Sequence, residues 1–194
     1  MATGDRVWHN CPMHPILDFF QRRLEPRIEA DFVEQEDRDL AIQLIDELQV
    51  QETMWSTEDH LRSYNCDQHQ AIYLAKKYSK KLFDLHGDVL YVHCFALIKY
   101  GVGGWLAVHT DKMNEGCSDC VLSAVMYLNA DYEGGEIVFP KTNKSYHPAS
   151  GTCISYPSLW PAYDHGVSKV TSGTRYAMAW CFTRNVDRAF KPYL

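Results

Sequence analysis

The stretch "DVLYVHCFALIKYG" (residues 88–101) marks a change in the pattern of the sequence. It is rich in β-branched and aromatic residues and ends in a glycine, which is typical of a strand that runs into a turn. Short strands with no helical pattern between them predict a sandwich or jelly roll rather than alternating β-α-β units. Four more runs of this kind follow: "CVLSAVMYLNA" (120–130), "GEIVFP" (135–140), "GTCISYP" (151–157) and "TRYAMAWCFTR" (174–184).

The sequence before residue 88 has the spacing of amphipathic helices. Apolar residues recur every three or four positions in "EDRDLAIQLIDELQ" (36–49) and in "DQHQAIYLAKKYSKKLFDLHG" (67–87). Gly87 is expected to end the second helix, and Ser56 in "STED" is a candidate N-cap. The residues predicted to face the core are Leu40, Leu44, Ile45 and Leu48 in the first helix and Ile72, Ala75, Tyr78, Leu82 and Leu85 in the second.

These patterns predict one domain of the α+β or mainly β class. Residues 1–87 are expected to form an N-terminal helical layer, and residues 88–194 a jelly-roll core, also called a double-stranded β-helix. A chain of 194 residues is long enough to bury a sizeable core of this kind.

The composition argues against some classes of binding partner and favours one cellular location. The formal net charge of -6 gives no basic surface for nucleic acid. No apolar stretch approaches the ~20 residues that span a bilayer, so no membrane partner is expected. The start, "MATGDRVWHNCPMHP", lacks the apolar run of a signal peptide. The 7 cysteines are scattered and odd in number, so we expect reduced thiols and a cytoplasmic location.

Three residues have the chemistry of a metal site. The segment "AVHTDKMNEG" (107–116) places His109 and Asp111 two positions apart, so in an extended chain their side chains share a face. His-x-Asp on its own is more often an ordinary surface pair on a solvated turn than part of a metal site. His165, far along the chain, is a candidate third ligand. Two imidazoles and one carboxylate suit either non-haem Fe(II) or zinc.

Arg175 follows His165 at the start of the last apolar run. A buried guanidinium needs an anionic partner, and its planar fork suits a carboxylate. Two partners are open at this point. One is an acidic side chain of the protein itself, and the other is the far carboxylate of a dicarboxylic acid whose keto-acid end binds the metal.

Several motifs occur in a fixed order: Tyr100, His109-x-Asp111, "SAVMYLN" (123–129), "EGGEIVFP" (133–140), "HPASGTCISYP" (147–157) and "DHGVSKVTSGTR" (164–175). In this order the sequence resembles the Fe(II)- and 2-oxoglutarate-dependent dioxygenases, specifically their prolyl 4-hydroxylase-like branch. The resemblance covers residues 88–184.

The resemblance implies roles for seven residues. His109, Asp111 and His165 match the iron ligands, and Arg175 matches the basic residue that binds the 5-carboxylate of 2-oxoglutarate. The residues that match positions around the cosubstrate are Tyr100, Tyr127 and Ser123. Fe(II), 2-oxoglutarate and O2 are the implied cofactors, with ascorbate as a candidate for reactivation. Gly134 and Gly135 are expected to serve the backbone of a turn.

The implied reaction is hydroxylation of an unactivated C–H bond, with 2-oxoglutarate decarboxylated to succinate and CO2. Halogenating relatives have Gly or Ala at the second ligand position, so Asp111 favours hydroxylation. The preferred substrate is a prolyl residue in a peptide or protein, with Trp105 and Trp160 as candidate walls for the ring. A free amino acid or other small molecule is the alternative. A non-catalytic jelly-roll binding module and a zinc hydrolase are alternatives of other classes, and the oligomeric state stays open.

Several other residues that could have a functional role are interpreted as structural or as weak candidates. Many relatives have Trp six residues after the basic residue, where this chain has Cys181, and Trp180 should face the other way on the strand. Cys117 and Cys120 are predicted to be free thiols. His93 is predicted to be hydrogen-bonded or partly exposed, and "KKYSKK" (76–81) to be a solvated helix face. His9, Cys11 and His14 form a weak candidate metal site near the start of the chain.

Overall fold

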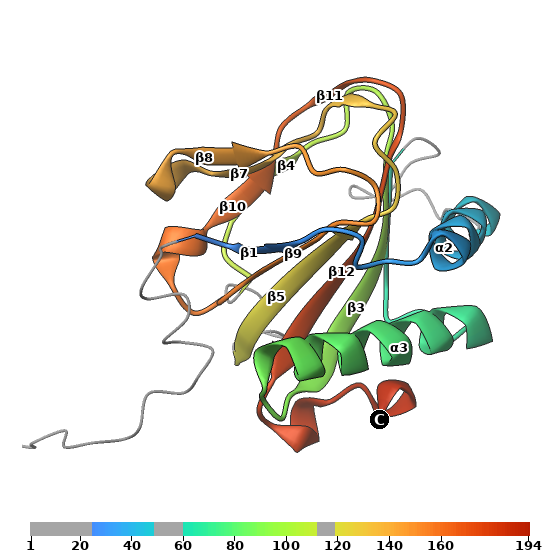
Figure 1. Cartoon of the computed structure of the whole chain (residues 1–194), viewed down its shortest axis with the longest axis vertical. Coiled ribbons are helices and arrows are strands. Elements are labelled where there is room, and N and C mark those ends of the chain that lie inside the picture. Colours follow the sequence, from blue (N-terminus) through green and yellow to red (C-terminus); the bar gives the residue numbers. More distant parts are fainter. Residues whose placement is uncertain (1–24, 49–59, 112–118) are drawn as a thin grey trace, which may run out of the picture.

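The computed structural model describes residues 25–48, 60–111 and 119–194. Its core is two antiparallel sheets that face each other (Figure 1). The larger sheet has the order β1 (Arg27–Glu29), β9 (Cys153–Tyr156), β5 (Cys120–Tyr127), β12 (Arg175–Thr183), β3 (Tyr91–Tyr100) and β2 (His60–Tyr64). The smaller has the order β4 (Leu106–His109), β10 (His165–Val167), β7 (Ile137–Phe139) and β8 (Lys144–Tyr146). This arrangement confirms the predicted jelly roll.

Short elements complete the chain. Strands β11 (Val170–Ser172) and β6 (Glu133–Gly134) pair at one end of the core. Gly134 at the end of β6 and Gly135 directly after it have φ of 70° and 66°, which confirms that the chain needs glycine where it turns here. Four 3-10 turns are η1 (Pro140–Thr142), η2 (Pro161–Tyr163), η3 (Val186–Arg188) and η4 (Lys191–Tyr193).

Both predicted helices are present. Helix α2 (Gln35–Glu47) buries Leu44 and Ile45, and α3 (His69–His86) buries Ala75, Tyr78 and Leu82, as the sequence indicated. Leu40, Leu48, Ile72 and Leu85 pack against the core while partly exposed. Gly87 ends α3 in the left-handed conformation, at φ 64°. Ser56 lies outside the described residues.

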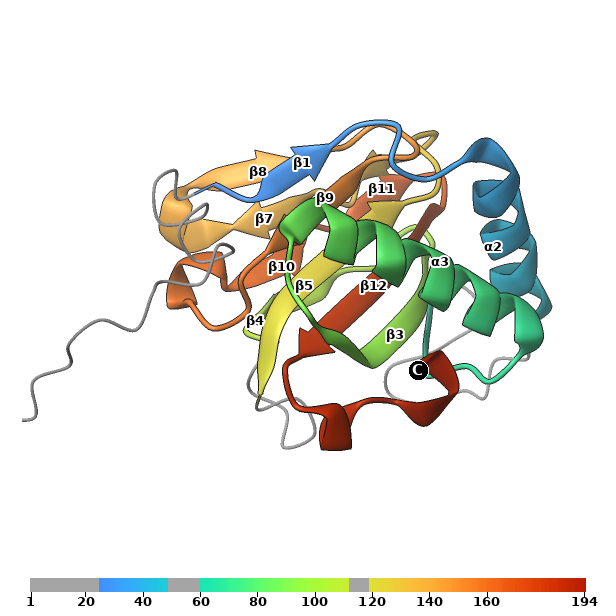
Figure 2. The same ribbon diagram turned by 60° about the horizontal axis from the view of Figure 1, so that its bottom comes forward.

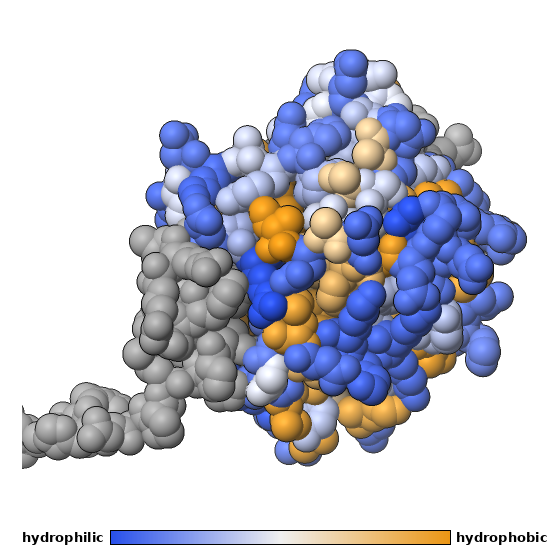
Figure 3. Space-filling view, viewed as in Figure 1, coloured by the Kyte–Doolittle hydropathy of each residue, from blue (hydrophilic) through white to orange (hydrophobic). Residues whose placement is uncertain are grey.

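Helix α3 crosses the outer face of the larger sheet (Figure 2). Trp180 of β12 points to this face, where its ring meets Tyr78 of α3 and Phe95 of β3. The surfaces of α2 and α3 are largely hydrophilic (Figure 3). Lysines of the 76–81 segment all have partners: Lys76 donates to the Leu194 carbonyl, Lys77 and Lys80 pair with acidic side chains, and Lys81 donates to the Phe32 carbonyl. The lysines of this segment therefore form a paired, solvated helix face, while Tyr78 and Ser79 between them are buried.

Two strands in the N-terminal part were not expected. Strand β1 pairs with β9, and β2 pairs with β3, so each forms one edge of the larger sheet. In the described parts of the chain no helix has both the length and the apolar composition needed to cross a membrane.

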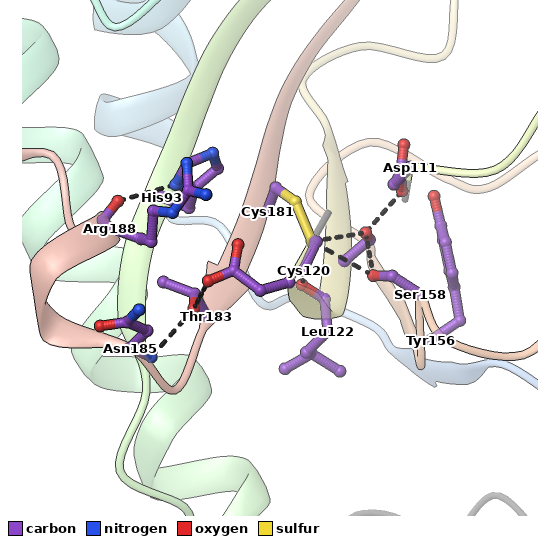
Figure 4. Close-up of a disulfide and its surroundings, with 12 residues drawn as sticks. His93, Asp111, Cys120, Leu122, Tyr156, Ser158, Cys181, Thr183, Asn185 and Arg188 are labelled. Carbon is purple, nitrogen blue, oxygen red and sulfur yellow. Dashed lines mark hydrogen bonds between the residues drawn. A yellow bond between two sulfur atoms is a disulfide. The ribbon is translucent and has the colours of Figure 1, made fainter. Parts of the chain in front are cut away.

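Cys120 and Cys181 form a disulfide between the neighbouring strands β5 and β12 (Figure 4). The prediction that Cys120 is a free thiol is therefore wrong. Its partner Cys181 is 61 positions away in the sequence and comes close to it only through the pairing of β5 with β12. Cys117 lies outside the described residues. His93 bonds to the Arg188 carbonyl through Nδ1 at 2.7 Å, which confirms its structural interpretation (Figure 4).

The disulfide is expected to stabilise the fold. It joins residues separated by 61 positions, and a cross-link over a loop of this size contributes about 2–4 kcal/mol. The double variant C120A/C181A should therefore lose about this much free energy of unfolding in urea. A reductant should lower the unfolding midpoint of the wild type but not that of the variant. Equal midpoints for the wild type with and without reductant would contradict this expectation.

Candidate metal centre

The smaller sheet brings two of the three predicted ligands together. His109 is the last residue of β4, His165 is the first residue of β10, and the two are directly opposed in the antiparallel register. Their ring centroids are 4.4 Å apart. Asp111 follows His109 by two residues, and its Oδ1 lies 3.3 Å from His109 Nε2 and 4.0 Å from His165 Nε2. One ligand atom from each residue lies within 4.8 Å of the others, a spacing that a metal ion can bridge.

Hydrogen bonds to the backbone orient both imidazoles. His109 Nδ1 lies 3.0 Å from the Ala107 carbonyl, and His165 Nδ1 lies 3.2 Å from the Tyr163 carbonyl. A carbonyl accepts only from a protonated Nδ1, so in the neutral form of each imidazole Nε2 carries the lone pair. This is the tautomer that binds a metal through Nε2.

Residues of the larger sheet support the ligands from the other side. The Ser123 hydroxyl of β5 donates to Asp111 Oδ2 at 2.5 Å and lies 2.6 Å from the Ser158 hydroxyl. Ser158 in turn lies 3.4 Å from Sγ of Cys120, next to the disulfide (Figure 4). The Tyr156 hydroxyl of β9 lies 2.9 Å from His165 Nε2. Ser123 thus fixes the carboxylate oxygen that faces away from the histidines.

The charges of the three residues are tightly coupled. Burial disfavours the ionised form of Asp111, but hydrogen bonds from His109 and Ser123 and the charge of His165 outweigh it and hold the pKa of Asp111 well below its usual range. Burial also opposes protonation of His109, yet Asp111 raises the pKa of His109 above its ordinary value. Burial lowers the pKa of His165 to about 4. The centre therefore combines a carboxylate with at least one neutral imidazole at neutral pH.

Arg175 lies in the same space between the sheets, and it is buried without a carboxylate partner. It is 2% exposed, and its Nε and Nη1 have no hydrogen-bond acceptor. No ion pair joins it to an acidic side chain within residues 25–48, 60–111 and 119–194. Burying a guanidinium without an anionic partner costs free energy, and a bound anion offsets this cost. This observation favours a bound dicarboxylic acid over an internal acidic partner.

Tyrosines surround this guanidinium. Its Cζ lies 4.9 Å from the ring centroid of Tyr127 and 5.8 Å from that of Tyr100, which faces it across β12 and β3. The hydroxyls of Tyr127 and Tyr132 are buried without hydrogen-bond partners. Burial raises the pKa of Tyr127 to about 12, so its hydroxyl is a donor at neutral pH. Gly135 leaves room for Arg175, because a Cβ there would lie 3.0 Å from Arg175 Cδ.

The remaining predicted residues have mixed outcomes. Cys181 faces the inside of the sandwich, where many relatives place Trp, and Trp180 faces outward as expected. Trp105 is 62% exposed, while Trp160 packs beside Tyr163. His9, Cys11 and His14 lie outside the described residues.

Three residues at this centre were missed by sequence reasoning: Tyr132, Tyr156 and Arg62. Tyr132 precedes the paired glycines and Tyr156 lies within a predicted strand, so the strand register could have suggested both. Arg62 lies on β2, an edge strand that the sequence pattern did not reveal.

The sequence profile described as the 2OG-Fe(II) oxygenase superfamily matches residues 95–183. This range contains His109, Asp111, His165 and Arg175. The part of the chain that carries the candidate centre is therefore similar to the 2OG-Fe(II) oxygenase superfamily. This similarity agrees with the paired histidines, the carboxylate and the unpaired arginine in one buried space.

Proteins similar to this chain are named as hydroxylases. A PKHD-type hydroxylase of Picosynechococcus sp. is 41% identical over 96 residues, which are 46% of this chain and 42% of that protein. Prolyl 3-hydroxylase 2 of Gallus gallus is 41% identical over 66 residues, which are 31% of this chain and 9% of that protein. The chain therefore spans less than half the length of these relatives.

Solved structures share the fold at low identity. The viral collagen prolyl hydroxylase of Paramecium Bursaria Chlorella virus-1 has a TM-score of 0.64 at 17% identity, covering 82% of this chain and 95% of that chain. A prolyl hydroxylase of Trichoplax adhaerens, in complex with a hypoxia inducible factor oxygen degradation domain peptide fragment, has a TM-score of 0.66 at 15% identity. It covers 90% of each chain.

Removal of the Ser123 hydroxyl is expected to weaken metal binding. In S123A, Asp111 Oδ2 loses its donor, and loss of such a supporting hydrogen bond typically costs about 10–100-fold in metal affinity. Calorimetric titration with Mn(II) measures this change. S145A removes an exposed hydroxyl on β8 and should leave the affinity unchanged. Equal affinities for S123A and S145A would contradict the role of Ser123.

Metal binding is also expected to depend on pH through His109. The pKa of His109 lies above the ordinary 6.5. Below its pKa the imidazole is protonated, and it must release this proton before it can bind a metal. Mn(II) affinity should fall by roughly tenfold per pH unit between about pH 6.5 and pH 5, because one proton competes. His165, with its pKa near 4, adds nothing in this window. Calorimetry in buffers of different ionisation enthalpy would count the protons, and no proton release at pH 6 would contradict this assignment.

Proposed function

We propose that the chain is an Fe(II)- and 2-oxoglutarate-dependent hydroxylase. In this proposal His109, Asp111 and His165 hold Fe(II), and Arg175 binds the 5-carboxylate of 2-oxoglutarate. The observation that carries it is the buried Arg175, which has two unpaired nitrogens and lies in the same inter-sheet space as the triad. A non-catalytic metal-binding module has no need for such a 2-oxoglutarate anchor, and a zinc hydrolase would be favoured only if zinc supported activity and 2-oxoglutarate did not.

The donor set fits a ferrous ion. Two imidazoles and one carboxylate on one side of a metal leave positions open for a chelating cosubstrate and dioxygen. Iron, once bound with these partners, supplies the oxidative decarboxylation of 2-oxoglutarate to succinate and CO2 and the hydroxylation of a C–H bond. His165 is buried, while His109 and Asp111 keep side-chain exposures of 28% and 23%. The centre is therefore reached from the side of His109 and Asp111.

The protein groups bind and orient the cosubstrate. Arg175 would form paired hydrogen bonds with the distal carboxylate. The Tyr127 hydroxyl, beside this guanidinium, would donate to the same group. Tyr100 lies between Arg175 and the edge strand β2 and would contact the cosubstrate along its length. Ser123 acts on Asp111 rather than on the cosubstrate, because its hydroxyl already donates to that carboxylate.

A prolyl residue in a peptide or protein is the proposed substrate. Support comes from the relatives named as prolyl hydroxylases and from the peptide complex of the Trichoplax protein. A free amino acid or another small molecule is the alternative substrate. Ascorbate as a reactivator and a cytoplasmic location stay predictions, and a reducing compartment would favour opening of the Cys120–Cys181 disulfide.

The test is an anaerobic titration of the Fe(II)-loaded protein with 2-oxoglutarate, followed by visible absorption. Chelation should give a charge-transfer band, and R175Q should raise the dissociation constant at least about tenfold, because a charge-assisted pair is lost from a buried site. R184Q removes a surface guanidinium that pairs with Asp88 and serves as the matched control.

Turnover and substrate are tested in the same preparations. Succinate formation should require iron and 2-oxoglutarate, and mass spectrometry of prolyl peptides should detect the gain of one oxygen atom. Absence of the band with iron verifiably bound would contradict the proposal. Hydroxylation of free amino acids without hydroxylation of any prolyl peptide would support the reaction and overturn the substrate.

A further inference from the structure

Buried hydrogen-bond donors without partners gather around Arg175. They are Nε and Nη1 of Arg175 itself and the hydroxyls of Tyr127 and Tyr132. Arg175 and Tyr127 have a role in the proposed cosubstrate site, whereas Tyr132 has none. Tyr132 is only 5% exposed. It directly precedes β6, at the end of the core where β6 pairs with β11 (Figure 1).

Two glycines place Tyr132 beside Arg175. A Cβ at Gly135 would lie 3.0 Å from Arg175 Cδ and 3.2 Å from Tyr132 Cε2, so both side chains pack against the same glycine. Nε of Arg175 is bonded directly to Cδ, and the Tyr132 hydroxyl is attached to the ring carbon next to Cε2. A Cβ at Gly173, two residues before Arg175, would lie 3.0 Å from Tyr132 Cα. The turn into β12 therefore holds the backbone of Tyr132 close to the start of the strand that carries Arg175.

The Tyr132 hydroxyl is directed into the protein and not into solvent. The exposed ring of His147 covers the Tyr132 ring, with a distance of 4.6 Å between the ring centroids. The hydroxyl at the other end of the ring is fully buried. Burial raises the pKa of Tyr132 above its ordinary value, so the hydroxyl keeps its proton at neutral pH and can donate it. A buried hydroxyl that donates to nothing costs free energy, and a ligand that accepts from it would remove this cost.

The chemistry of this cluster suits a carboxylate. Arg175 has only donors and a positive charge, and both tyrosine hydroxyls beside it have a proton to donate. A carboxylate has two oxygens that together accept about four hydrogen bonds, so one group can satisfy an arginine and two hydroxyls at once. The oxygen of Tyr132 can also accept from the guanidinium while its own proton goes to the ligand.

We propose that Tyr132 is a further cosubstrate-binding residue, whose hydroxyl donates to the same distal carboxylate that Arg175 and Tyr127 bind. The inference rests on the proposed function and deepens it, because it makes this end of the site selective for a keto acid with a second carboxylate. A keto acid that ends in a methyl group leaves all three side chains without an acceptor and binds through its metal-chelating end alone.

The experiment measures binding and not turnover. Mn(II)-loaded wild type, Y132F, R175Q and Y73F are titrated calorimetrically with 2-oxoglutarate and with 2-oxovalerate. The two ligands share the keto-acid end and the length of the carbon chain, but 2-oxovalerate has a methyl group in place of the distal carboxylate. Y73F is the matched control, because it removes the hydroxyl of an exposed tyrosine on α3 that accepts from Lys77. The Mn(II) affinity and the ligand-free thermal midpoint of each variant report whether the centre and the fold are intact.

Y132F should weaken 2-oxoglutarate binding by about tenfold, the usual size for a lost hydrogen bond to a charged group, and leave 2-oxovalerate binding unchanged. Its ligand-free thermal midpoint should not fall, because the hydroxyl has no partner before the ligand binds. Y73F should change neither ligand affinity. Unchanged 2-oxoglutarate binding in Y132F overturns the proposal. Equal losses for both ligands also overturn it, because Tyr132 would then shape the pocket without contacting the distal carboxylate.

The failure of the proposed function is distinguishable in the same data. If R175Q weakens 2-oxoglutarate binding selectively while Y132F does not, the Tyr132 inference fails and the proposed function stands. If the Mn(II)-loaded wild type does not bind 2-oxoglutarate, both are contradicted.

Discussion

The antiparallel pairing of β4 with β10 is the constraint on which the centre depends. It sets His109 directly opposite His165, so two residues far apart in sequence present their Nε2 atoms to the same point. The larger sheet then supplies the support, through Ser123 on Asp111 and Tyr156 on His165. The metal centre therefore exists only while the two sheets hold their separation, and the packing of rings between them, such as Phe139 of β7 against Tyr156 of β9, maintains it.

The same sandwich explains why an unpaired arginine is tolerated. Arg175 begins the central strand β12, which pairs along its length with β3 and β5. Those neighbours fix Arg175 between Tyr100 and Tyr127 whether or not an anion is present. The stability of the paired strands thus offsets the cost of a buried guanidinium, and the binding of a carboxylate recovers it.

Local sequence patterns and the order of the motifs predicted much of this structure. Periodicity located α2 and α3, because each buries an apolar face, and runs of β-branched and aromatic residues bounded by turn residues located β3, β5, β7, β9 and β12. Residue chemistry selected His109, Asp111, His165 and Arg175, which the fold brings into one space. Strand β2 and the Cys120–Cys181 disulfide were not predictable in this way. A short edge strand has little periodicity, and a cross-strand pair depends on register, which a single sequence does not specify. Arg62 was missed for the same reason, since its position depends on how β2 pairs with β3.

The most direct measurement of the central claim is a crystal structure of the protein with Mn(II) and 2-oxoglutarate, grown without oxygen. The account predicts the metal on Nε2 of His109, Nε2 of His165 and Oδ1 of Asp111, with the keto-acid end of the ligand on the metal and its 5-carboxylate on Arg175. A metal bound by other residues, or a ligand whose 5-carboxylate lies away from Arg175, would contradict it.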